Sequence, residues 1–95
     1  MLAAHLKYYI ILYMEFRWNG WNLEHATRHG VSILEAESLV RRGPARRVGD
    51  GKYEVVGRGS GGRWIQAVYV IDPQRTIYVI HARPLTNRER RRARR

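Results

Sequence analysis

Apolar residues recur at helical spacing in the first half of the chain and predict two consecutive helices. From Trp21 the run WNLEHATRH has this spacing, and Gly30 is placed to end the helix. Ser32 and Glu35 form a capping-box pair that begins a second helix. The apolar stripe of the second helix consists of Ile33, Ala36, Leu39 and Val40. Gly43-Pro44 ends it, because glycine is favoured just beyond a helix and proline cannot continue one.

Segments rich in β-branched and aromatic residues follow and predict an antiparallel sheet. They run over Ala45 to Val48, Lys52 to Val56, Arg63 to Ile71 and Thr76 to Ile80. The pieces between them have turn residues, most clearly Gly49-Asp50-Gly51 and Asp72-Pro73-Gln74-Arg75. A further short strand is expected over Glu15 to Trp18. The sequence thus predicts an α+β fold, with two N-terminal helices packed on one face of an antiparallel β-sheet meander.

The C-terminal segment joins the last strand to a basic helix. His81 and Arg83 extend that strand and share one face, since strand side chains alternate with period two. Thr86 and Glu89 form another capping-box pair, so a helix is expected to begin at Thr86. It carries six arginines between Asn87 and Arg95. An imidazole, a guanidinium and a basic helix so close in sequence would suit a polyanion.

The first residues stand apart from this pattern. We expect a single domain over 15–95 and an N-terminal extension over 1–14, because two smaller halves would each lack a core. The apolar run Tyr8 to Met14 is shorter than the roughly 18 residues of a membrane span, and no small-x-small cleavage site follows it. It is either an added edge strand or sequence upstream of an original start at Met14, and we favour the second reading. Both readings predict a soluble protein.

The strongly positive charge of the chain indicates which kinds of partner it would bind. The formal net charge is +10 and the sequence pI is near 11.1, which implies attraction to nucleic acid, an anionic membrane surface or an acidic protein. The chain has no cysteine, which excludes disulfides, thiol catalysis and cysteine-ligated zinc, and fits a reducing cytoplasm.

Two motifs resemble cofactor or metal sites but lack essential parts. The glycines of Gly57 to Gly62 satisfy GxGxxG, yet a strand follows where dinucleotide binding needs a helix N-terminus. We therefore expect a hairpin loop and no nucleotide cofactor. His25 and His29 are four residues apart and would share a helix face, but no glutamate or third ligand accompanies them. They are either structural or a general acid and base, since histidine titrates near neutral pH.

Metal-free RNA cleavage needs residue types that this chain contains. One group takes the 2′-hydroxyl proton, another protonates the leaving 5′-oxygen, and cations stabilise the charge on the phosphate oxygens. Histidine or glutamate can perform the first two tasks and arginine or lysine the third. The cations available are Lys52, Arg63, Arg83 and the arginines of the tail. These residue types alone are a weak signal in a basic protein.

Three runs of the sequence strengthen this interpretation: EFRWNGWNLEHATRHGVSILEAE, GKYEVVGRGSGGRWIQAVYV and TIYVIHARPLTNRERR. In order and spacing they resemble the BrnT family of bacterial toxins, small members of the RelE-like ribonuclease superfamily, over about Glu15 to Arg92. The pieces that carry the resemblance are the W-N start, the H-G-V-S step at His29 to Ser32, Ala82-Arg83 and the T-x-x-E-R of Thr86 to Arg90.

The resemblance implies a metal-independent endoribonuclease without a cofactor, which inhibits translation and is neutralised by an antitoxin with a ribbon-helix-helix DNA-binding domain. His29 matches the histidine of the family's K-H-G, Arg83 its A-R arginine, and Lys52 falls near a basic position. The acid/base and phosphate-binding candidates are His25, His29, Lys52, Arg63, His81 and Arg83. The RNA-binding candidates are Arg88, Arg90, Arg91 and Arg92. The alternative is a non-catalytic basic module of the same fold that binds RNA or a partner.

Overall fold

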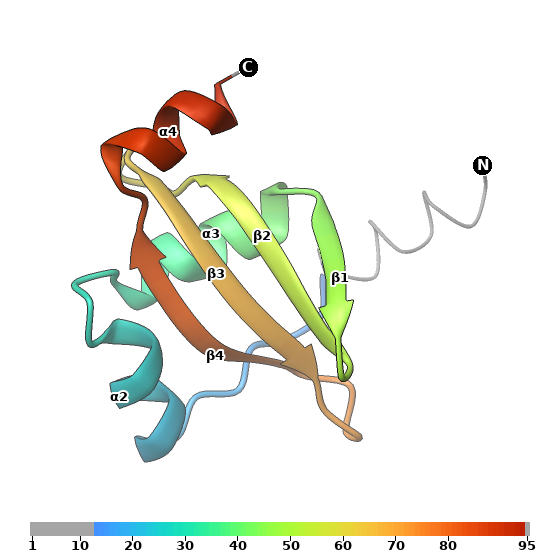
Figure 1. The fold of residues 1–95 in the computed structure, drawn as a ribbon. Helices are drawn as coiled ribbons and strands as arrows, with labels where there is room; N and C mark the ends of the chain where they lie inside the picture. Colours follow the sequence, from blue (N-terminus) through green and yellow to red (C-terminus); the bar gives the residue numbers. More distant parts are fainter. Residues whose placement is uncertain (1–12, 95) are drawn as a thin grey trace.

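A four-stranded antiparallel sheet in the order β1-β2-β3-β4 forms the centre of the structure (Figure 1). This computed structural model describes residues 13–94. The strands are β1 (Ala45–Gly49), β2 (Lys52–Arg58), β3 (Trp64–Ile71) and β4 (Ile77–Pro84). The helices are α2 (Gly20–Thr27), α3 (Ile33–Arg42) and α4 (Asn87–Ala93). The described part of the chain is thus an α+β domain, as the sequence predicted.

Side-chain caps explain where the helices begin. Ser32 and Thr86 each accept a hydrogen bond from the backbone N–H three residues on, and the carboxylates of Glu35 and Glu89 accept one from the backbone N–H of the cap residue. Both capping boxes were predicted. Asn19 caps α2 in the same way, and its reciprocal partner is Asn22, an asparagine in place of the usual glutamate or glutamine.

The end of α2 differs from the prediction. The helix stops at Thr27, so His29 lies beyond it rather than on its last turn. Gly30 follows with φ of +86°, a left-handed conformation that glycine adopts without a Cβ penalty. Its N–H donates to the Thr27 carbonyl and so closes the turn. This turn directs the chain from α2 into α3.

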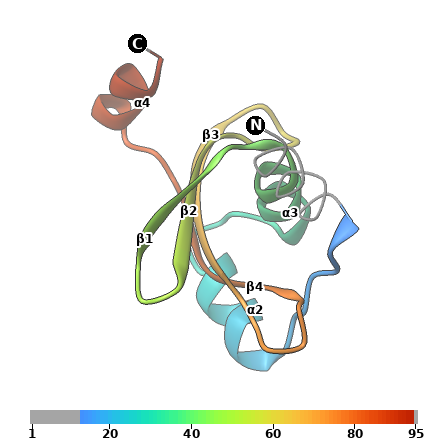
Figure 2. The same cartoon turned by 90° about the vertical axis from the view of Figure 1, so that its right-hand side faces the viewer.

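The core lies between α3 and one face of the sheet. Alternate strand residues are fully buried there, and they meet the apolar stripe of α3. The buried set from the helices and their connection is Ala26, Val31, Ala36, Leu39 and Val40; that from the sheet is Val55, Ile65, Ala67, Tyr69, Ile77, Val79 and Ala82. Figure 2, which views the sheet from its side, shows α3 lying against this face.

The placement of α2 corrects the expectation that both helices cover one face. Helix α3 packs on β2 and β3, whereas α2 packs on β4 at the edge of the sheet (Figures 1 and 2). The strand expected over Glu15 to Trp18 is also reduced to one parallel bridge, between Phe16 and Ile77. Pairing ends there because Asn19 begins the cap of α2. Phe16 and Trp18 still pack against the core.

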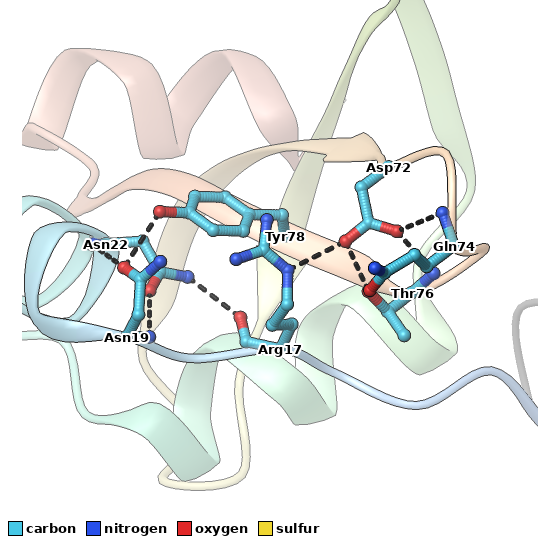
Figure 3. A network of polar contacts seen from close by, with 7 residues as sticks. All are labelled: Arg17, Asn19, Asn22, Asp72, Gln74, Thr76 and Tyr78. Atoms are coloured by element: carbon cyan, nitrogen blue, oxygen red, sulfur yellow. Dashed lines mark hydrogen bonds and ion pairs between the residues drawn. The ribbon is translucent and has the colours of Figure 1, made fainter.

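A polar network fastens this N-terminal segment to the turn between β3 and β4 (Figure 3). Asp72 accepts hydrogen bonds from the backbone of Gln74 and Thr76, from the Thr76 hydroxyl and from Arg17 Nε at 2.8 Å. These bonds, the Thr76 hydroxyl first, hold the pKa of Asp72 well below its usual range. The hydroxyl of Tyr78 also donates to Asn19 Oδ1 at 2.9 Å. The network therefore links two segments that are far apart in sequence.

The structure describes only the last two residues of the N-terminal extension over 1–14. Residues 1–12, which include most of the run proposed as an edge strand or upstream sequence, lie outside the described residues. Met14 packs against the core.

Within the described range 13–94, no helix has the length and apolar character that crossing a bilayer requires.

Candidate functional site

The sheet face opposite α3 carries several polar side chains, in rows set by the strand register. The register pairs Glu54 with Val68 and Val68 with His81; in the next row it pairs Gln66 with Arg83. These residues alternate with the buried positions of the same strands, so their side chains point away from the core. We call this surface the open face. Figure 1 looks onto it, with α3 behind the sheet.

A β-bulge in β4 decides which side chains reach the open face. Tyr69 pairs with Val79 but Val68 pairs with His81, so Ile80 is an extra residue in β4. Before the bulge the odd-numbered Ile77 and Val79 are buried, whereas after it the even-numbered Ala82 is. Without the extra residue, His81 would point into the core.

His81 and His29 form an imidazole pair at the edge of the open face. Their ring centroids lie 5.6 Å apart at an interplanar angle of 66°. His81 comes from β4 and His29 from the turn after α2, so the pair spans the junction between helix and sheet. Burial lowers the pKa of His81, and the charges of His29, Arg83 and Arg28 lower it further. The His81 ring is thus biased towards the neutral form that accepts a proton.

Arg83 lies two residues further along β4 and is bound by the C-terminal helix. Its two terminal nitrogens donate to the two carboxylate oxygens of Glu89 at 2.8 and 2.7 Å. This bidentate pair lowers the pKa of Glu89 to about 2, with the Thr86 backbone N–H as a second cause. Glu89 therefore caps α4 and binds Arg83 at the same time. The basic helix is thus anchored to a strand residue that lies two positions after His81.

Glu54 places a carboxylate on the same face, two strands away from His81. It accepts hydrogen bonds from Arg46 on β1, at 2.7 Å, and from the amide of Gln66. The Arg46 contact is the main cause of its lowered pKa, and Arg83 contributes through its charge. The sequence analysis missed Arg46, Glu54 and Gln66. Alternation from Lys52 would have placed Glu54 beside it, but only the pairing register brings Glu54 into the row of His81.

The remaining acid/base and phosphate candidates are distributed more widely. Lys52 begins β2 and is exposed, one step along the open face from Glu54. Arg63 donates to the Glu35 carboxylate at 2.8 and 2.9 Å and to the Gly30 carbonyl at 2.6 Å, so it braces α3. His25 lies against Trp21 on α2. The structure thus groups His29, His81 and Arg83 and leaves His25 and Arg63 in other contacts.

Helix α4 presents its arginines mainly to solvent. Arg88, Arg91 and Arg92 are exposed. Arg90 is half-buried and bonds Asn87 through one terminal nitrogen. The first three are therefore available to phosphate groups, which guanidinium binds through paired N–H donors.

Neither a metal cluster nor a known relative adds to this description. Within residues 13–94, no three His, Asp or Glu side chains are grouped so that they could hold a metal ion. Comparison with known proteins finds no significant match to a family model, a curated protein or a solved structure.

Proposed function

We propose that this protein is a RelE-like, metal-independent endoribonuclease of the BrnT type, the toxin of a type II toxin–antitoxin pair. The observation that carries the proposal is the grouping of His29, His81 and Arg83 on a basic face of the sheet. Two imidazoles and a guanidinium can perform the two proton transfers and the charge stabilisation of metal-free RNA cleavage. The net charge of +10 supports a polyanionic substrate.

The site supports a division of roles in a transesterification. Neutral His81 takes the proton of a 2′-hydroxyl as its oxygen attacks the adjacent phosphorus, and the pKa of His81 below its usual value favours this role. His29, on the other side of the pair, donates a proton to the 5′-oxygen that leaves. The products are a 2′,3′-cyclic phosphate and a 5′-hydroxyl end.

The charge that develops on the phosphate oxygens requires a cation within reach. Arg83 is two residues from His81 on the same face and can donate two parallel hydrogen bonds to a phosphate. An RNA phosphate would share or displace the Glu89 carboxylate that now holds this guanidinium. Lys52 and the exposed arginines of α4 extend the positive surface on either side of the pair.

Glu54 is a second group that could accept the 2′-hydroxyl proton. Its lowered pKa keeps it ionised, but Arg46 and Gln66 already occupy its oxygens. We therefore assign Glu54 to positioning the face around His81, and His81 to proton transfer. A Glu54→Gln variant would remove the base and keep an acceptor oxygen for only one of the two hydrogen bonds.

The proposed function also implies a substrate, a cellular compartment and a protein partner. A toxin of this type would act on messenger or ribosome-associated RNA in the cytoplasm. It would be held inactive in a hetero-oligomer with an antitoxin that carries a ribbon-helix-helix DNA-binding domain. The exposed arginines of α4 would suit acidic residues on that partner as well as RNA phosphates.

A specific observation also favours the alternative of a non-catalytic binding module. Glu89 and Glu35 occupy the guanidinium groups of Arg83 and Arg63, which leaves fewer cations for a transition state. In that case the open face and α4 would bind RNA or an acidic protein without cleaving it.

Induced expression of the chain in bacteria, followed by primer extension on total RNA, tests the proposal. We expect arrested growth and new RNA ends, both lost in His81→Ala and Arg83→Ala. Leu34→Ala, an exposed change on α3, is the control that should leave cleavage unchanged. Intact RNA in cells that contain folded protein would reject the nuclease and leave the binding module.

A further inference from the structure

A column of stacked planar groups lies beside the imidazole pair and outside the proposed cleavage chemistry. The Arg17 guanidinium lies 4.1 Å from the centroid of the Tyr78 ring. The Tyr78 ring in turn lies 6.3 Å from the ring of Trp21, with a 33° tilt. The imidazole of His25 stacks on Trp21 at 3.8 Å and 14°. We call these four residues the aromatic column.

The two ends of the aromatic column differ. At one end, Asp72 holds Arg17 through a 2.8 Å ion pair, and the Tyr78 hydroxyl is tied to Asn19 (Figure 3). The other end is the ring of His25, and Trp21, on which it stacks, is 52% exposed, a high fraction for a residue type that is usually well buried. His25 is fixed by a 2.7 Å hydrogen bond between Nδ1 and the Trp21 carbonyl. The exposed end is thus rigid before any ligand arrives.

From these contacts we infer that the exposed end of the column, Trp21 with His25, is a stacking site for an unpaired nucleobase. Ring faces that are already parallel and ordered bind a base without a large loss of side-chain entropy. The Nδ1 bond to a carbonyl requires a proton on Nδ1, which leaves Nε2 of neutral His25 as an acceptor for a base amino group.

Position and charge favour RNA over a protein as the occupant. Tyr78 pairs with Val70 and His81 with Val68, so the two side chains lie on the open face about 7 Å apart along the strand. A strand of RNA with its phosphate at His81 therefore passes the aromatic column with a neighbouring nucleotide. The net charge of +10 attracts that backbone and repels a basic protein surface.

This inference deepens the proposed function, because it assigns to the same site a preference for single-stranded RNA. Paired bases are stacked within a duplex and cannot lie against Trp21. The aromatic column would therefore select the strand state of the substrate, whereas the imidazole pair and Arg83 would act on its backbone.

The test uses a probe that cannot be cleaved, a single-stranded DNA of about ten nucleotides, within the size that small single-strand sites cover. Its affinity is measured by fluorescence anisotropy beside that of an abasic strand of equal length. We expect Trp21→Ala to weaken binding of the normal strand about 5- to 140-fold, the range that stacking of one base provides. Binding of the abasic strand should stay unchanged.

Three further variants separate stacking from other effects. Trp21→Phe keeps a ring and should retain most of the affinity, whereas Leu23→Ala changes an exposed residue of the same helix and should have no effect. Trp21→Ala should also leave the salt slope unchanged, while Arg91→Ala should reduce it by about 0.7, the loss of one phosphate contact. His25→Ala serves if Trp21→Ala fails to fold.

Two results would overturn the inference. One is an equal affinity of Trp21→Ala and the parent protein for the normal strand, which would point to a protein as the occupant of the aromatic column. The other is an equal loss for normal and abasic strands, which would mean that Trp21 only supports the fold. Because the probe lacks a 2′-hydroxyl, either result leaves the cleavage proposal to its own assay.

Discussion

Arg83 and Glu89 form a two-point ion pair, at 2.8 and 2.7 Å, that joins β4 to α4. Each side chain is about one-third exposed, so solvent screens the pair. Its main effect is therefore positional: it holds the basic helix against the end of β4 and keeps the Arg83 guanidinium paired with a carboxylate while no RNA is bound.

Glu89→Gln is expected to raise affinity for RNA, since it releases the Arg83 guanidinium to bind phosphate. The free energy of unfolding should fall only slightly, because the ion pair is partly exposed and screened by solvent. Anisotropy titrations and urea unfolding measure the two effects. Glu24→Gln, which alters an exposed ion pair 3.7 Å long on α2, is the control. Weaker RNA binding by Glu89→Gln would show that α4 must be anchored for Arg83 to bind.

The pKa of His81 should rise when His29 is replaced by alanine, because a positive neighbour that disfavours protonation has been removed. Burial is the larger cause, so the pKa should rise only part of the way to its usual value. NMR titration of the His81 ring measures the midpoint. His25→Ala should leave it unchanged, because His25 stacks on Trp21 instead. An unmoved midpoint in His29→Ala would mean that the two rings are not electrostatically coupled.

The Glu35–Arg63 ion pair should make stability depend on pH in the acid range. The hydrogen bond from Arg63 is the main cause that lowers the pKa of Glu35 to about 2, from 4.5. A carboxyl whose folded pKa is depressed stabilises the fold above its unfolded pKa, and this contribution is lost as pH falls through the folded value. Urea midpoints should therefore fall between about pH 5 and pH 2.

Glu35→Gln should flatten that fall, since glutamine does not titrate. Glu24→Gln is the matched control on an exposed surface and should retain the parent slope. Equal slopes in Glu35→Gln and the parent protein would mean that other carboxyls, such as Asp72 and Glu89, account for the acid sensitivity.

Gly43→Ala should destabilise the fold by about 1–3 kcal/mol, the usual cost of overpacking. A Cβ at Gly43 would lie 2.4 Å from Cγ1 of Val55, which is fully buried. Thermal and urea unfolding measure the loss. Gly20→Ala is the matched control: a Cβ there meets nothing within 4 Å, and alanine favours a helix. Equal stability of Gly43→Ala and the parent protein would show that α3 and β2 can separate slightly at no cost.

Local signals in the sequence predicted the parts of the fold that depend on neighbouring residues. Ser32 with Glu35, and Thr86 with Glu89, fixed two helix starts because both partners lie within one turn. The prediction that α2 covers the same sheet face as α3 was wrong. Its place at the edge strand β4 depends on contacts such as that of Tyr78 with Asn19, 59 residues apart, which local sequence signals do not contain.

In the candidate site, too, the sequence predicted what depends on neighbouring residues and missed what depends on contacts between distant ones. His81 and Arg83 share a face, as their spacing indicated. No signal in the neighbouring sequence, however, indicated that this face points away from the core. The partner of Arg63 is Glu35, 28 residues earlier. The sequence around Arg63, which precedes β3, therefore did not indicate that this arginine binds α3. Glu54 belongs to the site only through the register of three strands.

The extra residue Ile80 has a consequence for anyone who compares this chain with others. An alignment that runs through β4 without a gap would match His81 and Arg83 to inward-facing positions of a regular strand. One inserted residue is also the smallest change in length by which evolution can move a strand's second half from interior to surface. Related chains should therefore be sought with a gap permitted at residue 80, and judged by whether a histidine and an arginine follow it two residues apart.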